Sequence, residues 1–483
     1  MKSKKNKNVL VYGHFNILHP GHLRLFKFAK NLGNKLIVAV ESDKIAGDSS
    51  HVPQKLRLEA VKTNALVDEA FIFDTTINKL INKIKPNIVV KGKEFENKNN
   101  PELDIINKYG GKLLFSSGES LFSSTYLLKK ELSILESNKL NLQKNYLSRH
   151  KINHISLKKI VENFSKIKIC VIGDLIIDQY ITCDAIGMSQ EDPTLVITPI
   201  EKINYVGGAG IVASHGAKLG ANVSFLSVVG NDQLCKFSKA KLKENKVKFN
   251  LIVDDARPTT LKQRYRSKNK TLIRINNLYQ NNISIEIQNK IYENLLKQIK
   301  EINMIILSDF NYGCLPQKLV NKIINLAKKN KVKIIADSQS SSQLGNISRF
   351  KDCFLLTPTE HEARVSTHNN EDGLVFLSEE LRKKSNSKHI FLKLGEEGLL
   401  IHSSVTNKLK WINDKIDVIN QSPKDVAGAG DSFLIVSSLS LAVKSNIWES
   451  AYLGMIASAI QVGTIGNIPI DKSKIIEILD LLN

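Results

Sequence analysis

Three histidines and two glycines stand close together near the N-terminus, in the segment Gly13-His14-Phe15-Asn16-Ile17-Leu18-His19-Pro20-Gly21-His22. A glycine lets backbone approach a ligand closely, and His19 and His22 add two imidazoles at the same place. Donors so placed stabilise the negative charge that develops on a phosphate under attack. The segment predicts phosphate chemistry, although the pattern H-x-G-H alone is also compatible with ordinary surface histidines.

A second chemical motif is Asp425-Val426-Ala427-Gly428-Ala429-Gly430-Asp431-Ser432-Phe433, which an apolar stretch follows. Gly428, Ala429 and Gly430 leave backbone N–H groups open to an anion at a predicted helix N-terminus, where the helix dipole adds partial positive charge. Asp431, beside that anion hole, is placed to accept the proton of an attacking hydroxyl. The alternative is a flexible loop and helix cap without chemistry.

Alternating apolar and amphipathic stretches must position the first motif. Short apolar runs alternate with stretches whose apolar residues have helical spacing. This alternation predicts a parallel sheet flanked by helices. The expected strands are residues 9–12, 36–40, 70–73, 88–90 and 113–115, and the expected helices are residues 23–32, 55–66 and a segment after residue 123. The first motif then follows the first strand, where phosphates bind in open parallel sheets.

A second α/β rhythm carries the Gly428 motif. Residues 133–154 are polar, without Gly or Pro, and predict a helical or partly ordered connector. After it, strands are expected at residues 169–172, 223–228, 304–307, 333–336, 354–356 and 390–394, and helices at 431–443 and 448–462. The chain therefore divides into residues 1–132, a linker over 133–154, and residues 155–483, an α/β fold class throughout.

Composition limits the class of protein. With 483 residues the chain is too long for one core, and 42% hydrophobic residues indicate that most of it folds. We find no apolar run that spans a bilayer and no signal peptide, so we expect a cytoplasmic protein without a membrane partner. The five cysteines are scattered and form no metal motif, and the metal ligands stay unknown. The net charge of +22 is spread along the chain and carries no nucleic-acid motif, so no nucleic-acid partner is expected.

The N-terminal part resembles the H-x-G-H nucleotidylyltransferase superfamily, in particular its cytidylyltransferase-like group, over nearly all of residues 8–131. The matches are the first motif, residues 36–43, Arg57, Val90-Lys91-Gly92 and Phe122-Ser123-Ser124-Thr125. The resemblance implies a Rossmann-like domain in which a sugar-phosphate oxygen attacks the α-phosphorus of ATP or CTP and expels pyrophosphate. It implies catalysis by His19 and His22, and nucleotide or phosphate binding by Gly13, Phe15, Gly21, Lys44, Arg57, Ser123, Ser124 and Thr125.

Two positions depart from that family pattern. Asn16 stands where an Asp is usual, and Lys44 is the lysine nearest to the place, just before Gly47, where a phosphate-binding Lys is usual. Asn16 keeps hydrogen bonding but loses a charge, and Lys44 is the expected substitute for the missing lysine.

The C-terminal part resembles the ribokinase (phosphofructokinase-B) family from residue 168 to about residue 470. The matches are Ile172-Gly173-Asp174 with Asp178, Gly207-Gly208-Ala209, Gly220-Ala221-Asn222-Val223, Leu307-Ser308-Asp309-Phe310, Thr357-Pro358-Thr359-Glu360-His361-Glu362, Leu394-Gly395-Glu396-Glu397-Gly398 and the Gly428 motif. The resemblance implies a three-layer α/β kinase domain with a small β lid, which uses ATP and Mg²⁺. Asp431 would be the base, and the nucleotide or phosphate would be bound by Glu362, linked to Mg²⁺, with Gly395, Gly398, Gly428, Ala429 and Gly430. The sugar would be bound by Asp174, Asp178, Gly207 and Gly208.

Polar family positions are replaced in this part. Ile211 and Thr359 stand where Asn is usual, Ala427 stands where Thr is usual, and Asp337-Ser338-Gln339 stands for D-P-K. Each replacement removes a polar contact to sugar, metal or phosphate, which indicates a shifted substrate or a weakened kinase.

Both modules together resemble the bifunctional heptose 7-phosphate kinase and heptose 1-phosphate adenylyltransferase family, with the domain order reversed. The resemblance implies sugar phosphate and nucleoside triphosphate as substrates, a nucleotide-activated sugar for surface polysaccharide as product, and a homodimer formed through the kinase domain. The alternative is a cytidylyltransferase for a polyol or another sugar phosphate, attached to a kinase domain that is weakly active or serves as a sensor or dimerisation unit.

Overall fold

In this computed structural model, the described residues are 7–16, 18, 20–47, 52–92, 95, 100–115, 140–189, 192, 194–267, 270–340, 345–404 and 411–482. The chain divides into two compact units, residues 1–137 with 368–377, and residues 138–367 with 378–483. Four residues predicted for the first site, His19, Ser123, Ser124 and Thr125, lie outside the described residues.

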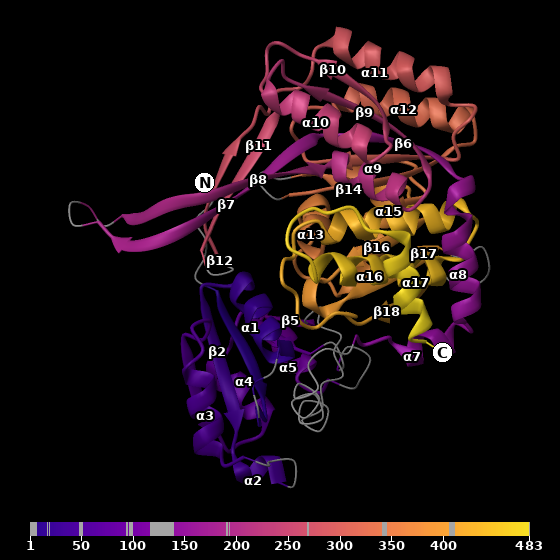
Figure 1. Cartoon of the computed structure of the whole chain (residues 1–483). Helices are drawn as coiled ribbons and strands as arrows, with labels where there is room; N and C mark the ends of the chain where they lie inside the picture. Colours follow the sequence, from indigo (N-terminus) through magenta and orange to yellow (C-terminus); the bar gives the residue numbers. More distant parts are fainter. Residues whose placement is uncertain are drawn as a thin grey trace. The chain divides into compact units, whose positions relative to one another are not determined.

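Parallel strands flanked by helices form the first unit, as the apolar rhythm predicts (Figure 1). The strands are β1 (Asn8–Gly13), β2 (Lys35–Glu41), β3 (Glu69–Phe73), β4 (Ile88–Lys91) and β5 (Lys112–Phe115). The helices are α1 (Pro20–Leu32), α2 (Asp43–Ala46), α3 (Gln54–Lys62), α4 (Ile77–Ile84) and α5 (Leu103–Lys108).

The sheet of the first unit is apolar on both faces. Val9 and Val11 of β1 belong to one buried cluster, and Leu10 between them belongs to another on the opposite face. Both faces of a parallel sheet are covered by helices, which is why its strands are continuous apolar runs. The strand order β3-β2-β1-β4-β5 reverses direction between β1 and β4, and ligands bind at the carboxyl ends of strands at such a point.

A sheet of order β10-β9-β6-β13-β14-β15-β16-β17-β18 forms the centre of the second unit. Its strands are β6 (Lys168–Gly173), β9 (Asn222–Val229), β10 (Lys248–Val253), β13 (Met304–Asp309), β14 (Lys333–Ser338), β15 (Leu355–Leu356), β16 (His389–Lys393), β17 (Leu399–Ser404) and β18 (Trp411–Ile416). The strands from β10 to β16 are parallel, whereas β17 and β18 pair antiparallel.

Helices cover this sheet in the second unit (Figure 1). They are α7 (Lys144–Arg149), α8 (His154–Glu162), α9 (Ala209–Lys218), α10 (Gln233–Glu244), α11 (Ile285–Gln298), α12 (Gln317–Lys329), α13 (Glu360–Thr367), α14 (Leu374–Ser385), α15 (Ala429–Ala442), α16 (Ile447–Val462) and α17 (Lys472–Asp480). Met304 and Ile306 of β13 pack in one buried cluster with α9, α15 and α16, so the residues between them face the other side of the sheet.

Part of the predicted connector packs into the second unit. Tyr146 and Leu147 of α7 and Ile152 belong to the same buried cluster as α15 and α16. The hydroxyl of Tyr146 donates to the carbonyl of Trp448 at 3.0 Å. These contacts add residues 144–152 to the packed second unit, while the predicted boundaries at 132 and 155 stay a prediction.

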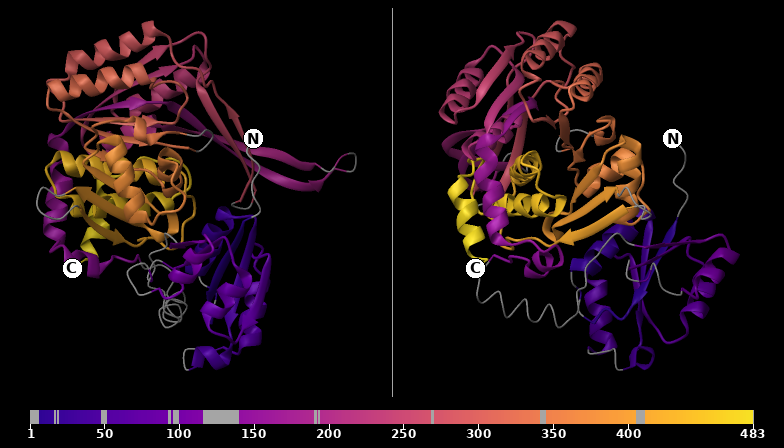
Figure 2. Two further views of the ribbon diagram at one scale, coloured as in Figure 1. Left: turned by 180° about the vertical axis from the view of Figure 1, so that it is seen from behind. Right: turned by 90° about the vertical axis from the view of Figure 1, so that its right-hand side faces the viewer.

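A smaller sheet of order β12-β11-β7-β8 extends from the second unit (Figure 2). Its strands are β7 (Leu175–Met188), β8 (Leu195–Gly208), β11 (Thr260–Ser267) and β12 (Lys270–Asn277). Long antiparallel pairing of β7 with β8 carries their hairpin beyond the central sheet. This sheet occupies the place of the predicted β lid.

Candidate active sites

The loop after β1 and the first turn of α1 hold the described part of the first predicted site. Gly13 is the last residue of β1, and Gly21 and His22 lie in the first turn of α1. Over residues 20–32, that first turn contains no acidic side chain. An anion would therefore meet the open N–H groups and the positive end of the helix dipole without a competing carboxylate.

Phe15 fixes the imidazole of His22. Its backbone is left-handed, with φ of 51°, and its side chain is 4% exposed. The Phe15 ring packs edge-on against the His22 ring, with 5.1 Å between centroids, and lies 5.5 Å from the ring of Phe26. The sequence predicted that Phe15 binds nucleotide, and the structure places it in the core, where it orients His22.

Arg57 holds the loop between β1 and α1 in place. Its side chain is fully buried, and its Nε donates to the carbonyl of Val52 at 2.7 Å while Nη1 donates to that of His14 at 2.6 Å. Its Nη2 pairs with Asp43 Oδ1 at 2.5 Å. The fork expected to bind phosphate is thus engaged in holding the loop between β1 and α1, whereas Lys44 of α2 is exposed.

A buried polar cluster that the sequence did not single out lies at the switch point of the first sheet. Glu102 Oε1 accepts from the Tyr12 hydroxyl at 2.8 Å and from Lys91 Nζ at 2.5 Å, and Lys91 also donates to Asn100 Oδ1 at 2.7 Å. Burial raises the pKa of Glu102, but the hydrogen bonds from Lys91, the backbone and Tyr12, with the charge of Lys91, together outweigh it and leave this pKa below its usual value. Lys91 belongs to the V-K-G element, and this element was the one feature of the sequence that pointed to the cluster.

In the second unit, a cavity of about 420 Å³ gathers most of the residues predicted for the kinase site. Its walls come from the lid sheet, from α15 and α16, and from the carboxyl ends of central strands. Of the predicted residues, those that line it are Asp178, Gly208, Glu362, Gly395, Gly398, Gly428, Ala429, Gly430 and Asp431. Asp174 and Gly207 are not among the lining residues.

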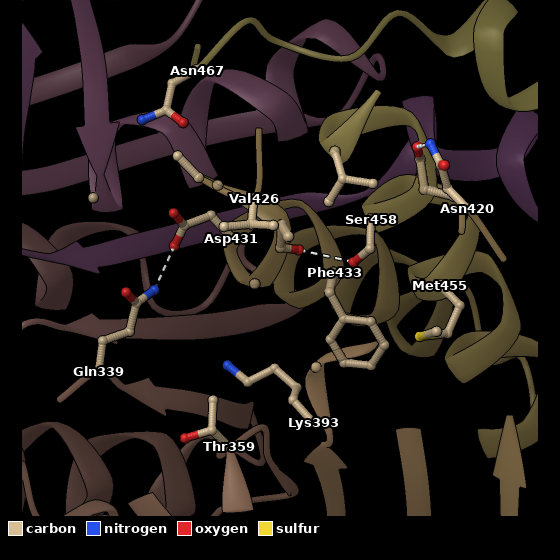
Figure 3. Close-up of a pocket in the computed structure, with 18 of the residues that line it drawn as sticks. Gln339, Thr359, Lys393, Asn420, Val426, Asp431, Phe433, Met455, Ser458 and Asn467 are labelled. Atoms are coloured by element: carbon tan, nitrogen blue, oxygen red, sulfur yellow. Dashed lines mark hydrogen bonds between the residues drawn. The ribbon is translucent and has the colours of Figure 1, made fainter. Parts of the chain in front are cut away.

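Asp431 lies in the first turn of α15 and faces this cavity (Figure 3). Its Oδ1 accepts a hydrogen bond of 3.0 Å from Gln339 Nε2. Burial, together with nearby Asp337, raises the pKa of Asp431 to about 7, although Lys393 opposes the change. A carboxylate with such a pKa is suited to act as a general base near neutral pH.

Gly428 shapes the turn that opens α15. It is the N-cap, with φ of 76°, and a Cβ there would lie 2.6 Å from Asn467 Oδ1. A side chain is therefore excluded both by the backbone conformation and by the neighbour. Gly428, Ala429 and Gly430 all line the cavity at the start of α15. That their N–H groups form an anion hole stays a prediction.

Lys393 and Asp337 form a buried ion pair beside Asp431. Lys393 Nζ lies 2.9 Å from Asp337 Oδ1, which also accepts from Thr357 Oγ1 at 3.0 Å. Burial lowers the pKa of Lys393, but Asp337 and Glu362 outweigh it and raise this pKa above its usual value. Sequence reasoning missed Lys393, because no motif spacing relates residue 393 to residue 431.

The opposite end of the cavity is built around Asp178 of β7. Its carboxylate pairs with Arg264 of β11 and accepts from Asn467 Nδ2 at 2.7 Å. A Cβ on Gly207 would lie 2.1 Å from Asp178 Oδ2. Gly207 does not line the cavity itself, but its lack of a side chain leaves room for the Asp178 carboxylate. Asn467 was not predicted from the sequence.

Asp174 organises the loop after β13. Its buried carboxylate accepts from the backbone N–H groups of Phe310 at 2.8 Å, Tyr312 at 3.4 Å and Cys314 at 3.2 Å. Burial and the neighbouring Asp309 raise the pKa of Asp174 to about 6. A sugar-binding role for Asp174 stays a prediction, while its contacts in the structure are all with this loop and its surroundings.

Glu362 joins two loops at the edge of the cavity. Its Oε1 accepts from the N–H of Ser340 at 3.0 Å, and its Oε2 from that of Thr359 at 2.7 Å. Asp337 Oδ2 is buried without a hydrogen-bond partner among the described residues. The described part of the chain contains no group of three His, Cys, Asp or Glu that would hold a metal by itself. Glu362 lines the cavity, and Asp337 lies beneath it as the partner of Lys393. Glu362 fits Mg²⁺ that arrives on a nucleotide, because Mg²⁺ usually takes one or two protein carboxylates and substrate phosphates.

Comparison with known proteins gives a family match for each of the two parts of the chain that hold the candidate sites. Residues 166–473 match the pfkB family of carbohydrate kinases, and residues 10–111 match the cytidylyltransferase-like family. The chain belongs to the pfkB carbohydrate kinase family. The expected fold class is confirmed, as is the expectation of an enzyme with kinase and nucleotidyltransferase domains.

Curated relatives include two proteins named bifunctional protein HldE. That of Aliarcobacter butzleri is 32% identical over 319 residues, which is 65% of this chain and 64% of the relative. That of Helicobacter pylori is 29% identical over 304 residues, or 62% of this chain and 64% of the relative. The chain therefore spans less than two thirds of the length of these relatives. Among the described residues, no helix is both long and apolar enough to cross a membrane.

Solved pfkB-type structures share the fold of the second unit. Arabidopsis thaliana ribokinase complexed with ribose and ATP matches with a TM-score of 0.51 at 18% identity, over 65% of this chain and 98% of that one. Phosphofructokinase-2 from Escherichia coli in complex with substrates and products matches with a TM-score of 0.54 at 15% identity, over 65% and 99% of the two chains.

The replaced pfkB positions differ in where they lie. Ile211 is 1% exposed in α9 and does not line the cavity, whereas Thr359, Ala427 and Gln339 do. Gln339 now donates to the catalytic candidate Asp431. The departures from the pfkB pattern are therefore concentrated where nucleotide and phosphate would lie, rather than at Asp178.

Proposed function

We propose that the protein is a bifunctional enzyme whose kinase module phosphorylates a sugar phosphate and whose N-terminal module transfers a nucleotide to a sugar 1-phosphate. The observation that carries the kinase half is Asp431, buried with a pKa of about 7 at the start of α15, in a cavity shared with Asp178. The cytidylyltransferase-like match and the loop from Gly13 to His22 support the transferase half. We place the transferase module at residues 1–132 and the kinase module at residues 155–483. We expect the protein to be located in the cytoplasm.

The kinase step follows from the residues around Asp431. The sugar hydroxyl, oriented by Asp178, transfers its proton to the Asp431 carboxylate while its oxygen forms a bond to the γ-phosphorus of ATP. The bond from that phosphorus to the bridging oxygen breaks, and ADP leaves with the electron pair. The N–H groups at the start of α15 stabilise the charge on the transferred group. Mg²⁺, bound through the phosphates near Glu362 and Asp337, would neutralise further phosphate charge.

A phosphate already present on the sugar explains the cations of the lid sheet. Lys262 and Arg264 of β11 and Arg274 of β12 all line the cavity. Arg264 is paired with Asp178, and the Lys262 ammonium lies 5.2 Å from the ring centroid of Phe310. Three cations at the sugar end exceed what a neutral sugar needs, and arginine binds phosphate well. We therefore favour a phosphorylated sugar over a free one.

The transferase step uses the first unit. The oxygen of a sugar 1-phosphate attacks the α-phosphorus of a nucleoside triphosphate, and pyrophosphate leaves. His22, with His19, would donate to the phosphate oxygens, and Ser123, Ser124 and Thr125 would hold phosphate by the family pattern. The expected product is a nucleotide-activated sugar like ADP-heptose, as the resemblance to the heptose kinase and adenylyltransferase family implies. A reversed domain order relative to that family stays a prediction. ATP and CTP are both retained as nucleotide donors.

Two substitutions test the bifunctional proposal. Asp431→Asn is expected to abolish ATP-dependent phosphorylation of sugar phosphates and to leave pyrophosphate release from ATP or CTP unchanged. His22→Ala is expected to do the reverse. If the wild-type protein phosphorylates no member of a broad sugar and sugar-phosphate panel, while still releasing pyrophosphate with a polyol phosphate, the alternative of a cytidylyltransferase with a divergent kinase module is correct.

We also propose that the protein forms a homodimer through the lid sheet. Large apolar side chains are exposed on the β7 and β8 hairpin, among them Ile186 at 67%, Met188 at 63% and Ile200 at 69%. Exposed apolar side chains on a strand pair favour a protein–protein contact, and a second copy of the chain offers a matching hairpin. Ile186→Asp with Ile200→Asp is expected to convert a dimer into a monomer in light scattering. A monomeric wild-type protein at micromolar concentration would contradict this proposal.

A further inference from the structure

The ammonium of Lys393 lies directly beneath the start of α15. A Cβ added to Gly430 would lie 3.4 Å from Lys393 Nζ, an ordinary contact distance. Figure 3 shows the side chain directed into the cavity, between Gln339, Thr359 and Phe433. Lys393 comes from the carboxyl end of β16, which is the side of a parallel sheet where ligands bind.

The residue that the pfkB pattern would use for this charge is absent. Where the pattern D-P-K has lysine, this chain has Gln339, whose amide donates to Asp431. A glutamine supplies a hydrogen bond but no positive charge. Of the other cavity cations, Lys262 and Arg264 stand on β11, on the lid side with Asp178. Lys393 and Lys262 both act on Asp431 by lowering its pKa, Lys393 more strongly. Lys393 comes from the central sheet and lies next to Gly430 at the start of α15.

Burial makes Lys393 costly as a purely structural residue. It pairs with Asp337 at 2.9 Å, and the exposed fractions of the two side chains are 14% and 1%. A buried ion pair is often no more stabilising than apolar residues of the same volume. The carboxylates of Asp337, Glu362 and Asp431 all raise the pKa of Lys393, so the ammonium stays charged. A phosphate group in the cavity would be a further favourable partner for that charge.

We propose that Lys393 is the cation that binds the transferred phosphoryl group, supplied from β16 in place of a lysine at position 339. The inference rests on the proposed kinase function. During transfer, the bond from the sugar oxygen to the γ-phosphorus forms as the bond to the ADP oxygen breaks. Lys393 neutralises charge on the non-bridging oxygens of that phosphorus, while the proton goes to Asp431.

The test compares kcat and KM for the full-length protein with a sugar-phosphate panel and ATP. Lys393→Met is expected to lower kcat by about 100-fold or more, as loss of one such donor does elsewhere, with the KM for the sugar within about threefold. Because that variant leaves Asp337 buried without its cation, Asp337→Asn with Lys393→Met is measured too and is expected to fold with the same low kcat. Lys388→Met, an exposed lysine before the same strand, is the matched control and is expected to keep the wild-type kcat.

Restoring the charge from the other strand distinguishes phosphate binding from structural support. Gln339→Lys in the Lys393→Met background is expected to recover kcat at least about tenfold. A folded Lys393→Met protein with unchanged kcat, or a low kcat that Gln339→Lys does not recover, overturns the role of Lys393 while the kinase proposal stands. A wild-type protein that phosphorylates no sugar overturns the kinase proposal itself, so the two failures are distinguishable.

Discussion

At the scale of single residues, the kinase site depends on carboxylates whose environments differ. Asp431 is buried near another carboxylate and has a pKa of about 7, whereas Glu102 in the first unit is held charged by Lys91. The first arrangement favours a group that exchanges protons, and the second favours a fixed ion pair. Carboxylates of the same kind are therefore suited to proton transfer in one unit and to a fixed ion pair in the other.

The pH dependence of phosphorylation follows from Asp431. The base must be deprotonated to accept the hydroxyl proton, and its pKa is raised to about 7 by burial and by Asp337. We expect kcat/KM to fall about tenfold for each pH unit below that value and to level off above it. Steady-state rates between pH 5.5 and 9 measure this, and a rate that is flat across pH 6 to 8 would contradict it.

Gly207 leaves room for the carboxylate of Asp178, the proposed sugar ligand. Since a Cβ at residue 207 would lie 2.1 Å from Asp178 Oδ2, Gly207→Ala displaces that carboxylate. The KM for the sugar is expected to rise about tenfold, an effect of about 1.4 kcal/mol, while the KM for ATP stays the same. Gly463→Ala is the control, because the nearest atom to its Cβ lies at 3.4 Å. Equal loss in both variants would show that the effect is not specific to Asp178.

At the scale of elements, the helix starts and strand ends do most of the positioning. The predicted strands at residues 9–12 and 304–307 are confirmed as β1 and β13, because buried parallel strands are unbroken apolar runs. The lid strands β11 and β12 were not located from the sequence. Their exposed, charged faces lack the alternation that identifies a half-buried strand.

Substitution of Asp174 tests how far the loop after β13 depends on one buried carboxylate. Asp174→Asn keeps the volume but loses an acceptor for the N–H groups of Phe310, Tyr312 and Cys314. We expect the kinase unit to lose roughly 2 kcal/mol of stability, because a buried donor without its charged acceptor costs about that much. The thermal transition of the kinase unit should then fall by several degrees. An unchanged transition temperature would show that the loop does not depend on Asp174.

Local patterns also limited what the sequence revealed about the two sites. The motif around Gly428 and Asp431 predicted one part of the cavity wall because its residues are adjacent in the chain. Lys393 and Asn467 reach the same cavity from distant segments, so only the strand order and the packing of α15 bring them there. Phosphate binding by Arg57 stays a prediction, and its partners in the loop were visible only in three dimensions.

At the scale of the whole molecule, two α/β units each place a helix N-terminus at their own candidate site. The first unit offers a loop between β1 and α1, and the second offers the start of α15. Each unit has its own buried clusters. Two chemistries on one chain are therefore expected to be separable by mutation, because each site draws its described residues from one unit.

The most direct test of this account is to measure both activities on the same Asp431→Asn and His22→Ala preparations. The account predicts that Asp431→Asn loses phosphorylation of a sugar phosphate by about 10²-fold to 10⁴-fold and retains pyrophosphate release, while His22→Ala shows the reverse. If Asp431→Asn phosphorylates sugar phosphates at the wild-type rate, the base at the start of α15 and the kinase function built on it are contradicted.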